Sequence, residues 1–286
     1  MERNDHPAQD WIPNETRENQ DQRDVDDAMR RQCPVAYSDL LQWSIFRDED
    51  VLRVLTDHET FSNDVSRYLS VPNGMDPPEH TVYRNVIVPY FSRERMQVFE
   101  PICRELVAEL TEQVVAKGQL DIVSEFALDV AVRSHCAFLG WPPSLHEALS
   151  DWTIRSREAA RTLDQPALAE IAREFQELAG GILAQRREAE AAPDVDITAS
   201  LMHETVFSRR LDDMEIASIL RNWTVGEIGT ISASIGILVH YLAEHPMLQE
   251  RLRNEPLLLS PSIDEILRMH GPLVANRRVT TRTVEL

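Results

Sequence analysis

The sequence is poor in glycine and cysteine, and both scarcities restrict what the chain can be. Only 9 of its 286 residues are glycine, which together with long runs of helical periodicity favours a mainly helical fold. The three cysteines, Cys33, Cys103 and Cys136, are isolated and odd in number, so we expect reduced, buried thiols. No two histidines lie three or four residues apart, which excludes a helical zinc pair. Any metal must therefore come inside a cofactor or be ligated elsewhere.

Basic charge and long apolar runs are also scarce. The formal net charge is -19, and no basic stripe is visible, which argues against a nucleic-acid partner. No apolar run approaches the roughly 20 residues that a bilayer span needs, and the first residues lack the apolar core of a signal peptide. We therefore expect a cytoplasmic protein without a membrane partner. The hydrophobic content of 43% is enough for a substantial core.

The chain divides into a polar beginning and a patterned remainder. Residues 1–32 are rich in charged and amide side chains and predict a loosely held arm, so we place a single domain over residues 33–286. Alternation over Leu41–Phe46 predicts a short strand, and residues 48–57 predict a capped helix. The expected fold class is mainly α with a small β-sheet.

One stretch, from Asp212 to His245, organises the rest of the chain. Its apolar residues recur at helical spacing, and no charge occurs between Ile228 and Val239, so the helix should be buried on several faces. Asp212 with Glu215 forms a capping pattern, and Pro246 ends the run. Such a helix is roughly 50 Å long at about 1.5 Å per residue, and we expect it to be the spine of the fold.

The middle of this helix carries Gly226, Glu227, Gly229 and Thr230. Each interior glycine costs about 1 kcal/mol relative to alanine, so we expect something to need the space. The ordinary interpretation is helix packing, in which a small residue admits another helix and Thr230 bonds back to a carbonyl. The pattern alone favours that interpretation.

A second helix start follows the loop over residues 66–75. In Asp76-Pro77-Pro78-Glu79, Asp76 is the expected cap and Pro77 the first helical residue. His80 and Arg84 then lie four apart on one face, where two donors can meet an anion. A solvated surface pair is the alternative.

These residues resemble the cytochrome P450 family, the haem-thiolate monooxygenases, of the bacterial type. The resemblance rests on residues 76–84 with Pro89-Tyr90-Phe91-Ser92, and it covers roughly residues 33–286. It implies that His80 and Arg84 hold the haem propionates, for which charged donors are suitable partners. It also implies a P450 fold.

The C-terminal part of the sequence continues the resemblance. Glu265 and Arg268, three apart, are similar to the family's structural Glu-x-x-Arg ion pair. They are followed by Pro272-Leu273-Val274 and by an alternating strand from Arg278, and the family's arginine at the Arg278 position reaches a haem propionate. Other Glu-x-x-Arg spacings, such as Glu158 with Arg161, are expected to be surface ion pairs.

The resemblance implies an enzyme that inserts one oxygen atom of O2 into an apolar organic substrate. Its electrons would come from a ferredoxin, a flavodoxin or a reductase. Thr230 would assist proton delivery in a groove opened by Gly226 and Gly229. The family's acid precedes the threonine directly, whereas Glu227 lies three residues before Thr230, so its role as a proton relay is a weaker prediction.

The family's cysteine loop, which ligates the iron, does not occur in the sequence, and the three cysteines lie in other contexts. We therefore expect a P450 fold that is incomplete at the C-terminus, with haem as cofactor and no thiolate ligand from this chain. The alternative is a non-catalytic remnant or a helical ligand-binding or scaffold protein without functional haem. Five residues could line an apolar substrate pocket or simply pack the core: Trp223, Val225, Ile228, Leu273 and Val274.

Overall fold

The computed structural model describes residues 10–13, 21–193, 196–273 and 275–286. The chain forms two compact units, one made of Met1–Val65 with Arg277–Leu286 and the other of Ser66–Asn276. Much of the predicted polar arm (residues 1–9 and 14–20) and Val274 of the predicted apolar segment lie outside the described residues.

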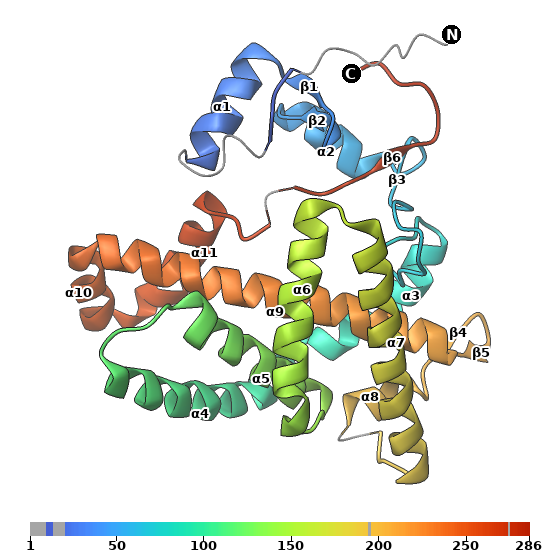
Figure 1. Ribbon diagram of the computed structural model, residues 1–286, viewed down its shortest axis with the longest axis vertical. Helices are drawn as coiled ribbons and strands as arrows, with labels where there is room; N and C mark the ends of the chain where they lie inside the picture. Colours follow the sequence, from blue (N-terminus) through green and yellow to red (C-terminus); the bar gives the residue numbers. More distant parts are fainter. Residues whose placement is uncertain (1–9, 14–20, 194–195, 274) are drawn as a thin grey trace. The chain divides into compact units, whose positions relative to one another are not determined.

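The smaller unit combines short helices with two small sheets (Figure 1). Its elements are α1 (Gln22–Gln32), β1 (Val35–Ser38), β2 (Gln42–Ile45), α2 (Asp48–Thr56), β3 (Phe61–Ser62) and β6 (Val279–Thr280). β1 pairs antiparallel with β2, and β3 with β6, so that Phe61 lies opposite Thr280. The strand and helix predicted at residues 41–46 and 48–57 are confirmed, as is a small β component.

Helix α1 occupies the last third of the range that the sequence marks as a polar arm. Asp21 caps it by accepting a hydrogen bond from the Arg23 N–H, and Val25 is buried. Further upstream, Trp11 packs edge-on against Phe46 with ring centroids 5.2 Å apart. Composition alone did not predict this helix, because a cap and a single buried apolar residue leave little mark in a polar segment. The domain boundary at residue 32 remains a prediction.

The larger unit is helical apart from one two-stranded hairpin. Its α-helices are α3 (Glu79–Ile87), α4 (Arg93–Lys117), α5 (Leu128–Leu139), α6 (His146–Thr162), α7 (Gln165–Glu188), α8 (Ile197–Leu201), α9 (Asp213–Glu244), α10 (Pro246–Asn254) and α11 (Leu259–Met269). Short 3-10 segments, η1 (Val88–Phe91), η3 (Pro143–Leu145) and η4 (Pro256–Leu258), and a π-helical turn, η2 (Val123–Ala127), connect them, and β4 (Thr205–Val206) pairs with β5 (Arg209–Arg210). Ser260 and Pro261 belong to the first turn of α11, where proline is tolerated.

Helix α9 is the spine that the sequence predicted. It runs through the larger unit from the β4–β5 hairpin to α10 (Figure 1) and packs against α5 and α7. The Asp212 carboxylate accepts from the Glu215 N–H, and the Glu215 carboxylate accepts from the Asp212 N–H. This capping box satisfies two backbone donors at the helix start, and His245 is the C-cap.

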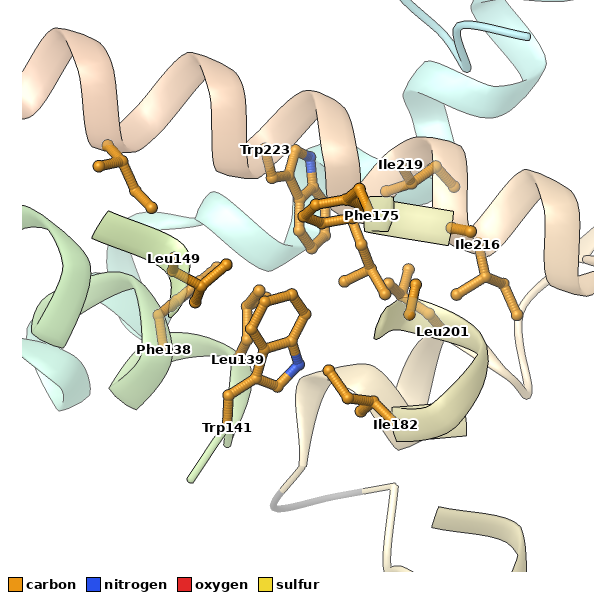
Figure 2. Close-up of a cluster of buried hydrophobic side chains, with 14 of the residues drawn as sticks. Phe138, Leu139, Trp141, Leu149, Phe175, Ile182, Leu201, Ile216, Ile219 and Trp223 are labelled. Atoms are coloured by element: carbon orange, nitrogen blue, oxygen red, sulfur yellow. The ribbon is translucent and has the colours of Figure 1, made fainter. Parts of the chain in front are cut away.

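The core of the larger unit gathers around the first half of α9. Large side chains from α5, α6, α7 and α8 converge on it in Figure 2, among them Phe138, Leu149, Phe175 and Leu201. Trp223 reaches from α9 into the same cluster. Burial of this kind contributes roughly 1.5–3 kcal/mol for each large apolar side chain, so the core fixes the rotation of α9 about its own axis.

Helix α9 is also, by length and composition, apolar enough to cross a membrane. The prediction that no apolar run approaches that length is therefore too strict, although core helices pass the same test. Eleven of the residues in α9 are buried, including Ile219 and Ile228, which are fully enclosed. The apolar window that meets the membrane criterion is itself only 17% buried, since most of the buried residues lie in the first half of α9.

Candidate functional site

A cavity of about 320 Å³ opens in the larger unit between α3, η1, the loop before α3 and the middle of α9. It brings together three of the residues predicted from sequence: Arg84, Gly226 and Glu227. Arg84 and Glu227 are the two charged residues among those described at its lining, which is made of Pro72, Asn73, Arg84, Val88, Phe91, Asn222, Trp223, Gly226 and Glu227. The cavity thus has an apolar wall with one cation and one carboxyl group.

Arg84 is carried into this cavity by α3. The helix starts at Glu79 with Pro78 as its N-cap residue, so the prediction that Asp76 caps and Pro77 opens the helix is wrong. Pro77 and Pro78 have no N–H to donate, and the Asp76 backbone carbonyl accepts from the His80 N–H at 2.9 Å.

The two donors predicted on α3 differ in their surroundings. Arg84 is exposed and its guanidinium has no hydrogen-bond or ion-pair partner within the part of the chain that the structure describes. His80 is half-buried one turn earlier and is not among the described residues that line the cavity. Arg84 is therefore a cation available to a bound anion, while a role for His80 remains a prediction.

Gly226 and Gly229 thin one side of α9 without admitting a neighbouring helix. A Cβ atom added to either glycine would meet no described atom within 4 Å. Gly236, about two turns beyond Gly229, behaves as a packing glycine, because an added Cβ would lie 2.9 Å from Cγ2 of Val123. The helix-packing interpretation of Gly226 and Gly229 is therefore wrong for the residues that the structure describes.

Thr230 turns its hydroxyl back onto its own helix. Its Oγ1 donates to the Gly226 carbonyl at 2.6 Å, as the ordinary interpretation of a helical threonine predicts. Neither Thr230 nor Gly229 is among the described residues that line the cavity. A role for Thr230 in proton delivery remains a prediction, and it would require this hydroxyl to leave the carbonyl.

Glu227 is held by a histidine that the sequence did not single out. Nδ1 of His135, on α5, lies 2.8 Å from Glu227 Oε2, and Nε2 lies 2.9 Å from Oγ1 of Thr224. The His135 side chain is 0% exposed, whereas that of Glu227 is 24% exposed. A lone histidine on an apolar helix gives no sequence signal for such a contact, because its partner is 92 residues away.

A buried carboxylate ties α3 to the start of α9. Glu215 accepts hydrogen bonds from Arg209, at 2.6 and 2.7 Å, and from the Tyr83 hydroxyl on α3. The Arg209 guanidinium, together with these hydrogen bonds, lowers the pKa of Glu215 to about 2 against the opposing effect of burial. Burial, followed by the Glu215 carboxylate, raises the pKa of Tyr83 to about 12. Arg84 is thereby held in a fixed position along α9.

The loop before α3 is fastened to α9 in the same way. Ser218 accepts from the Val71 N–H at 2.8 Å and donates to the Leu69 carbonyl at 2.8 Å. Asn222 donates to the Val71 carbonyl at 2.9 Å. These bonds hold Pro72 and Asn73 at the cavity, and sequence reasoning missed both anchoring residues.

The remaining predicted site residues lie elsewhere. Glu265 and Arg268 on α11 form an ion pair at 2.7 Å, but 56% and 69% of their side chains are exposed, as in the pair of Glu158 with Arg161. Such pairs stabilise little. Arg278 belongs to the smaller unit, next to β6, and its Nε is buried without a hydrogen-bond partner among the described residues.

Of the residues described at the cavity, none is a cysteine. All three cysteines are free, as predicted, but only Cys136 is fully buried while Cys33 and Cys103 are half-buried. Burial raises the pKa of the Cys136 thiol to about 12 and also raises that of Cys103, so these two remain protonated thiols. Within the described ranges, no group of three or more His, Cys, Asp or Glu side chains is placed to bind a metal ion.

Among the described residues predicted to line a substrate pocket or pack the core, Trp223 lies at the cavity. It belongs both to the lining and to the buried cluster. Ile228 is a fully buried core residue, whereas Val225 and Leu273 are 51% and 67% exposed. Val274 lies outside the described residues.

Comparisons with known proteins give one consistent set of relatives. The chain is 31% identical over 268 residues to the erythromycin C-12 hydroxylase of Saccharopolyspora erythraea, covering 90% of this chain and 67% of that one. It is also 31% identical over 252 residues to a probable cytochrome P450 of Sinorhizobium fredii, covering 85% of this chain and 59% of that one. No protein-family model matches the chain.

Solved structures agree with these relatives. The open form of cytochrome P450 EryK from S. erythraea matches with a TM-score of 0.79 at 27% identity, over 92% of this chain and 69% of that one. A Bacillus megaterium cytochrome P450 in complex with testosterone matches with a TM-score of 0.77 at 25% identity, over 92% and 71% of the two chains. The chain thus spans about 59% to 71% of the length of these relatives.

Proposed function

The chain belongs to the cytochrome P450 family, and on that premise we propose that it forms the oxygen-binding side of a haem-thiolate monooxygenase. The proposed reaction inserts one oxygen atom of O2 into an apolar organic substrate. The observation that carries the proposal is the cavity in which Arg84 of α3 faces the open backbone of Gly226 on α9.

The lining of this cavity fits haem. A porphyrin needs a flat apolar wall and cations for its two carboxylates, and the cavity offers Val88, Phe91 and Trp223 together with Arg84. The Arg84 guanidinium has no partner among the described residues, so it is free to bind a propionate in a bidentate geometry. His80 keeps the propionate-binding role predicted from sequence, whereas Arg278 belongs to the smaller unit and its role stays a prediction from sequence.

Haem supplies the activation of O2, and the residues of this chain supply the surroundings. Gly226 leaves room for a small molecule beside α9, because no side chain fills that space. Glu227 brings a carboxyl group to the same cavity, where it can accept and return a proton. Thr230, with its hydroxyl on the Gly226 carbonyl, could join that path after a rotation about its Cα–Cβ bond.

Partners and location follow the same proposal. One relative is named a hydroxylase and another an epoxidase, of cyclomarin C, and both names describe addition of oxygen to an organic molecule. We accordingly assign O2, an apolar organic substrate and an electron donor such as a ferredoxin, a flavodoxin or a reductase. The free cysteines fit a reducing, cytoplasmic compartment.

Haem titration of the purified chain tests the cofactor. We expect saturable binding followed by the Soret band, and a dissociation constant at least tenfold higher for Arg84→Gln, since a lost charged hydrogen bond costs roughly 1.5–3 kcal/mol. Arg104→Gln is the matched control, because Arg104 is an exposed arginine on α4 that pairs with Glu100. Equal affinities of Arg84→Gln and Arg104→Gln would remove Arg84 from the site.

Isotope labelling tests the reaction itself. Because this chain supplies no thiolate to the iron, it is joined to a cytochrome P450 segment that carries the iron-ligating cysteine. The haem-loaded fusion is then supplied with a reducing ferredoxin system, ¹⁸O2 and a panel of apolar substrates. We expect one labelled oxygen atom in each product molecule. Tight haem binding without any labelled product would favour the alternative, a non-catalytic haem- or ligand-binding protein of the same fold.

A further inference from the structure

The structure assigns a specific task to His135, and this assignment rests on the proposed function. We propose that His135 is a positioning residue that fixes the Glu227 carboxyl group with Oε1 as a permanent hydrogen-bond acceptor toward the cavity. Glu227 then becomes the residue that takes a proton from the cavity and returns it there.

The chain of groups begins at Thr224, whose single hydroxyl hydrogen has one possible destination. Thr224 Oγ1 lies 2.8 Å from the Leu220 carbonyl oxygen and 2.9 Å from His135 Nε2. Two oxygen atoms without a hydrogen between them would repel at 2.8 Å, so the hydroxyl must donate to Leu220. Thr224 can then only accept from the ring, and His135 Nε2 must carry a hydrogen.

The opposite ring nitrogen faces the carboxyl group. His135 Nδ1 and Glu227 Oε2 are 2.8 Å apart, and a hydrogen bond at that distance requires one proton between them. Either an imidazolium donates to a carboxylate, or the carboxylic acid donates to a neutral ring that keeps its Nε2 hydrogen. In both arrangements the proton lies on the line between Nδ1 and Oε2.

Glu227 Oε1 is therefore an acceptor in both arrangements. It has no hydrogen-bond partner among the described residues, and Glu227 lines the cavity with part of its side chain exposed. A water molecule or a substrate hydroxyl in the cavity would donate to this oxygen. When Oε1 takes up a proton from the cavity, the His135–Glu227 pair holds two protons, the one shared between Nδ1 and Oε2 and the new one on Oε1. Return of the second proton to an acceptor in the cavity restores the pair with its single shared proton.

The surroundings keep this arrangement rigid. The His135 ring is fully enclosed, with Trp141 packed edge-on against it at 5.7 Å between ring centroids. Thr224 is also 0% exposed, so water does not compete for either ring nitrogen. Among the described groups, the hydrogen-bond chain ends at the Leu220 carbonyl inside α9, and its only opening is at Glu227. The proton is consequently exchanged with the cavity and not with bulk solvent behind α5.

Nitrogen-15 NMR of the ring in the purified chain, without haem, tests the proton count. We expect a covalently attached hydrogen on Nε2 of His135, seen as one-bond coupling, in the wild-type chain and in Glu227→Gln. In Thr224→Val, which removes the acceptor, we expect that coupling to disappear. A wild-type ring without a hydrogen on Nε2 would overturn the proposal. Thr224 would then donate to the ring, and the placement of the hydrogens that makes Glu227 Oε1 an acceptor would no longer hold.

A second measurement separates positioning from folding. In the same haem-loaded fusion, which supplies the thiolate ligand, with a reducing system, we expect Glu227→Gln and His135→Gln each to lower product formed per electron consumed by about tenfold or more, while Thr224→Ser retains it. Unchanged yield in both glutamine variants would overturn the proposal. Absence of product from the wild-type chain would count against the proposed function, and the ring NMR would still decide the assignment of His135.

Discussion

Replacing Gly226 with alanine should separate the stability of α9 from the function of its cavity. Gly226 lies in the interior of a long helix, and an added Cβ atom would meet no described atom within 4 Å. Gly180 lies in the interior of α7 under the same conditions, with no described atom within 4 Å of an added Cβ. The two substitutions therefore add the same methyl group to equally open helix positions.

Both substitutions should stabilise the folded chain. An interior glycine costs about 1 kcal/mol relative to alanine, because it loses more backbone freedom on folding. Without a clash to offset this gain, Gly226→Ala and Gly180→Ala should each raise the free energy of unfolding by about 1 kcal/mol. Urea unfolding followed by circular dichroism measures the change.

Only the cavity substitution should affect haem. The methyl group of Gly226→Ala would occupy the space beside Arg84 and Trp223, and overpacking a close contact costs roughly 1–3 kcal/mol. We expect the haem dissociation constant to rise by about tenfold or more for Gly226→Ala and to stay unchanged for Gly180→Ala. Equal haem affinity of the two variants would refute the assignment of Gly226 to the cofactor wall. A loss of stability in Gly226→Ala would refute the inference that the space beside Gly226 is open.

Two further predictions concern the bonds that hold the site together. The pKa of Glu215 is lowered from 4.5 to about 2, so its contribution to stability is complete above the unfolded value and is lost as the pH falls through the folded one. Glu215→Gln should lower the free energy of unfolding by about 2 kcal/mol at pH 7, after discounting for the half-exposed Arg209. The loss should become progressively smaller as the pH falls from 4.5 to about 2. Urea unfolding, with Glu158→Gln as control, measures the change, and an equal loss at pH 7 and at the acid end of this range would contradict the prediction. Tyr90→Phe removes a buried hydroxyl that lies 2.8 Å from Glu204 and should cost about 1–2 kcal/mol, whereas a thermal midpoint equal to that of the wild type would show that the hydroxyl contributes nothing.

The sequence was most informative where structure depends on local pattern. The capping residues Asp212 and Glu215 and the apolar spacing that follows them predicted α9 to within one residue at each end. The prediction succeeded because a buried helix needs its apolar residues at helical spacing whatever packs on it. The start of α3 was misplaced for the same local reason, since the signal of Asp76 as a cap outweighed the lack of N–H groups in the two prolines.

The sequence was least informative where function depends on contacts between distant segments. His135 meets Glu227 across 92 residues, and Tyr83 meets Glu215 across 132. Such pairs follow from how α5 and α3 lie against α9, which no spacing within one helix encodes. The family resemblance supplied Arg84 and Gly226, but it pointed to Thr230 and not to the histidine that holds the acid.

Paramagnetic NMR of the haem-loaded chain tests the central claim most directly. Ferric haem broadens the amide signals of residues near the iron, whereas zinc protoporphyrin does not, so the difference between the two spectra maps the cofactor. We expect the amide signals of Gly226, Glu227 and Arg84 to be lost with ferric haem and retained with zinc protoporphyrin, while the signal of Gly180 on α7 is visible in both. Broadening that spares Gly226 and Arg84, or that spreads evenly over the surface, would contradict a haem site in the cavity between α3 and α9.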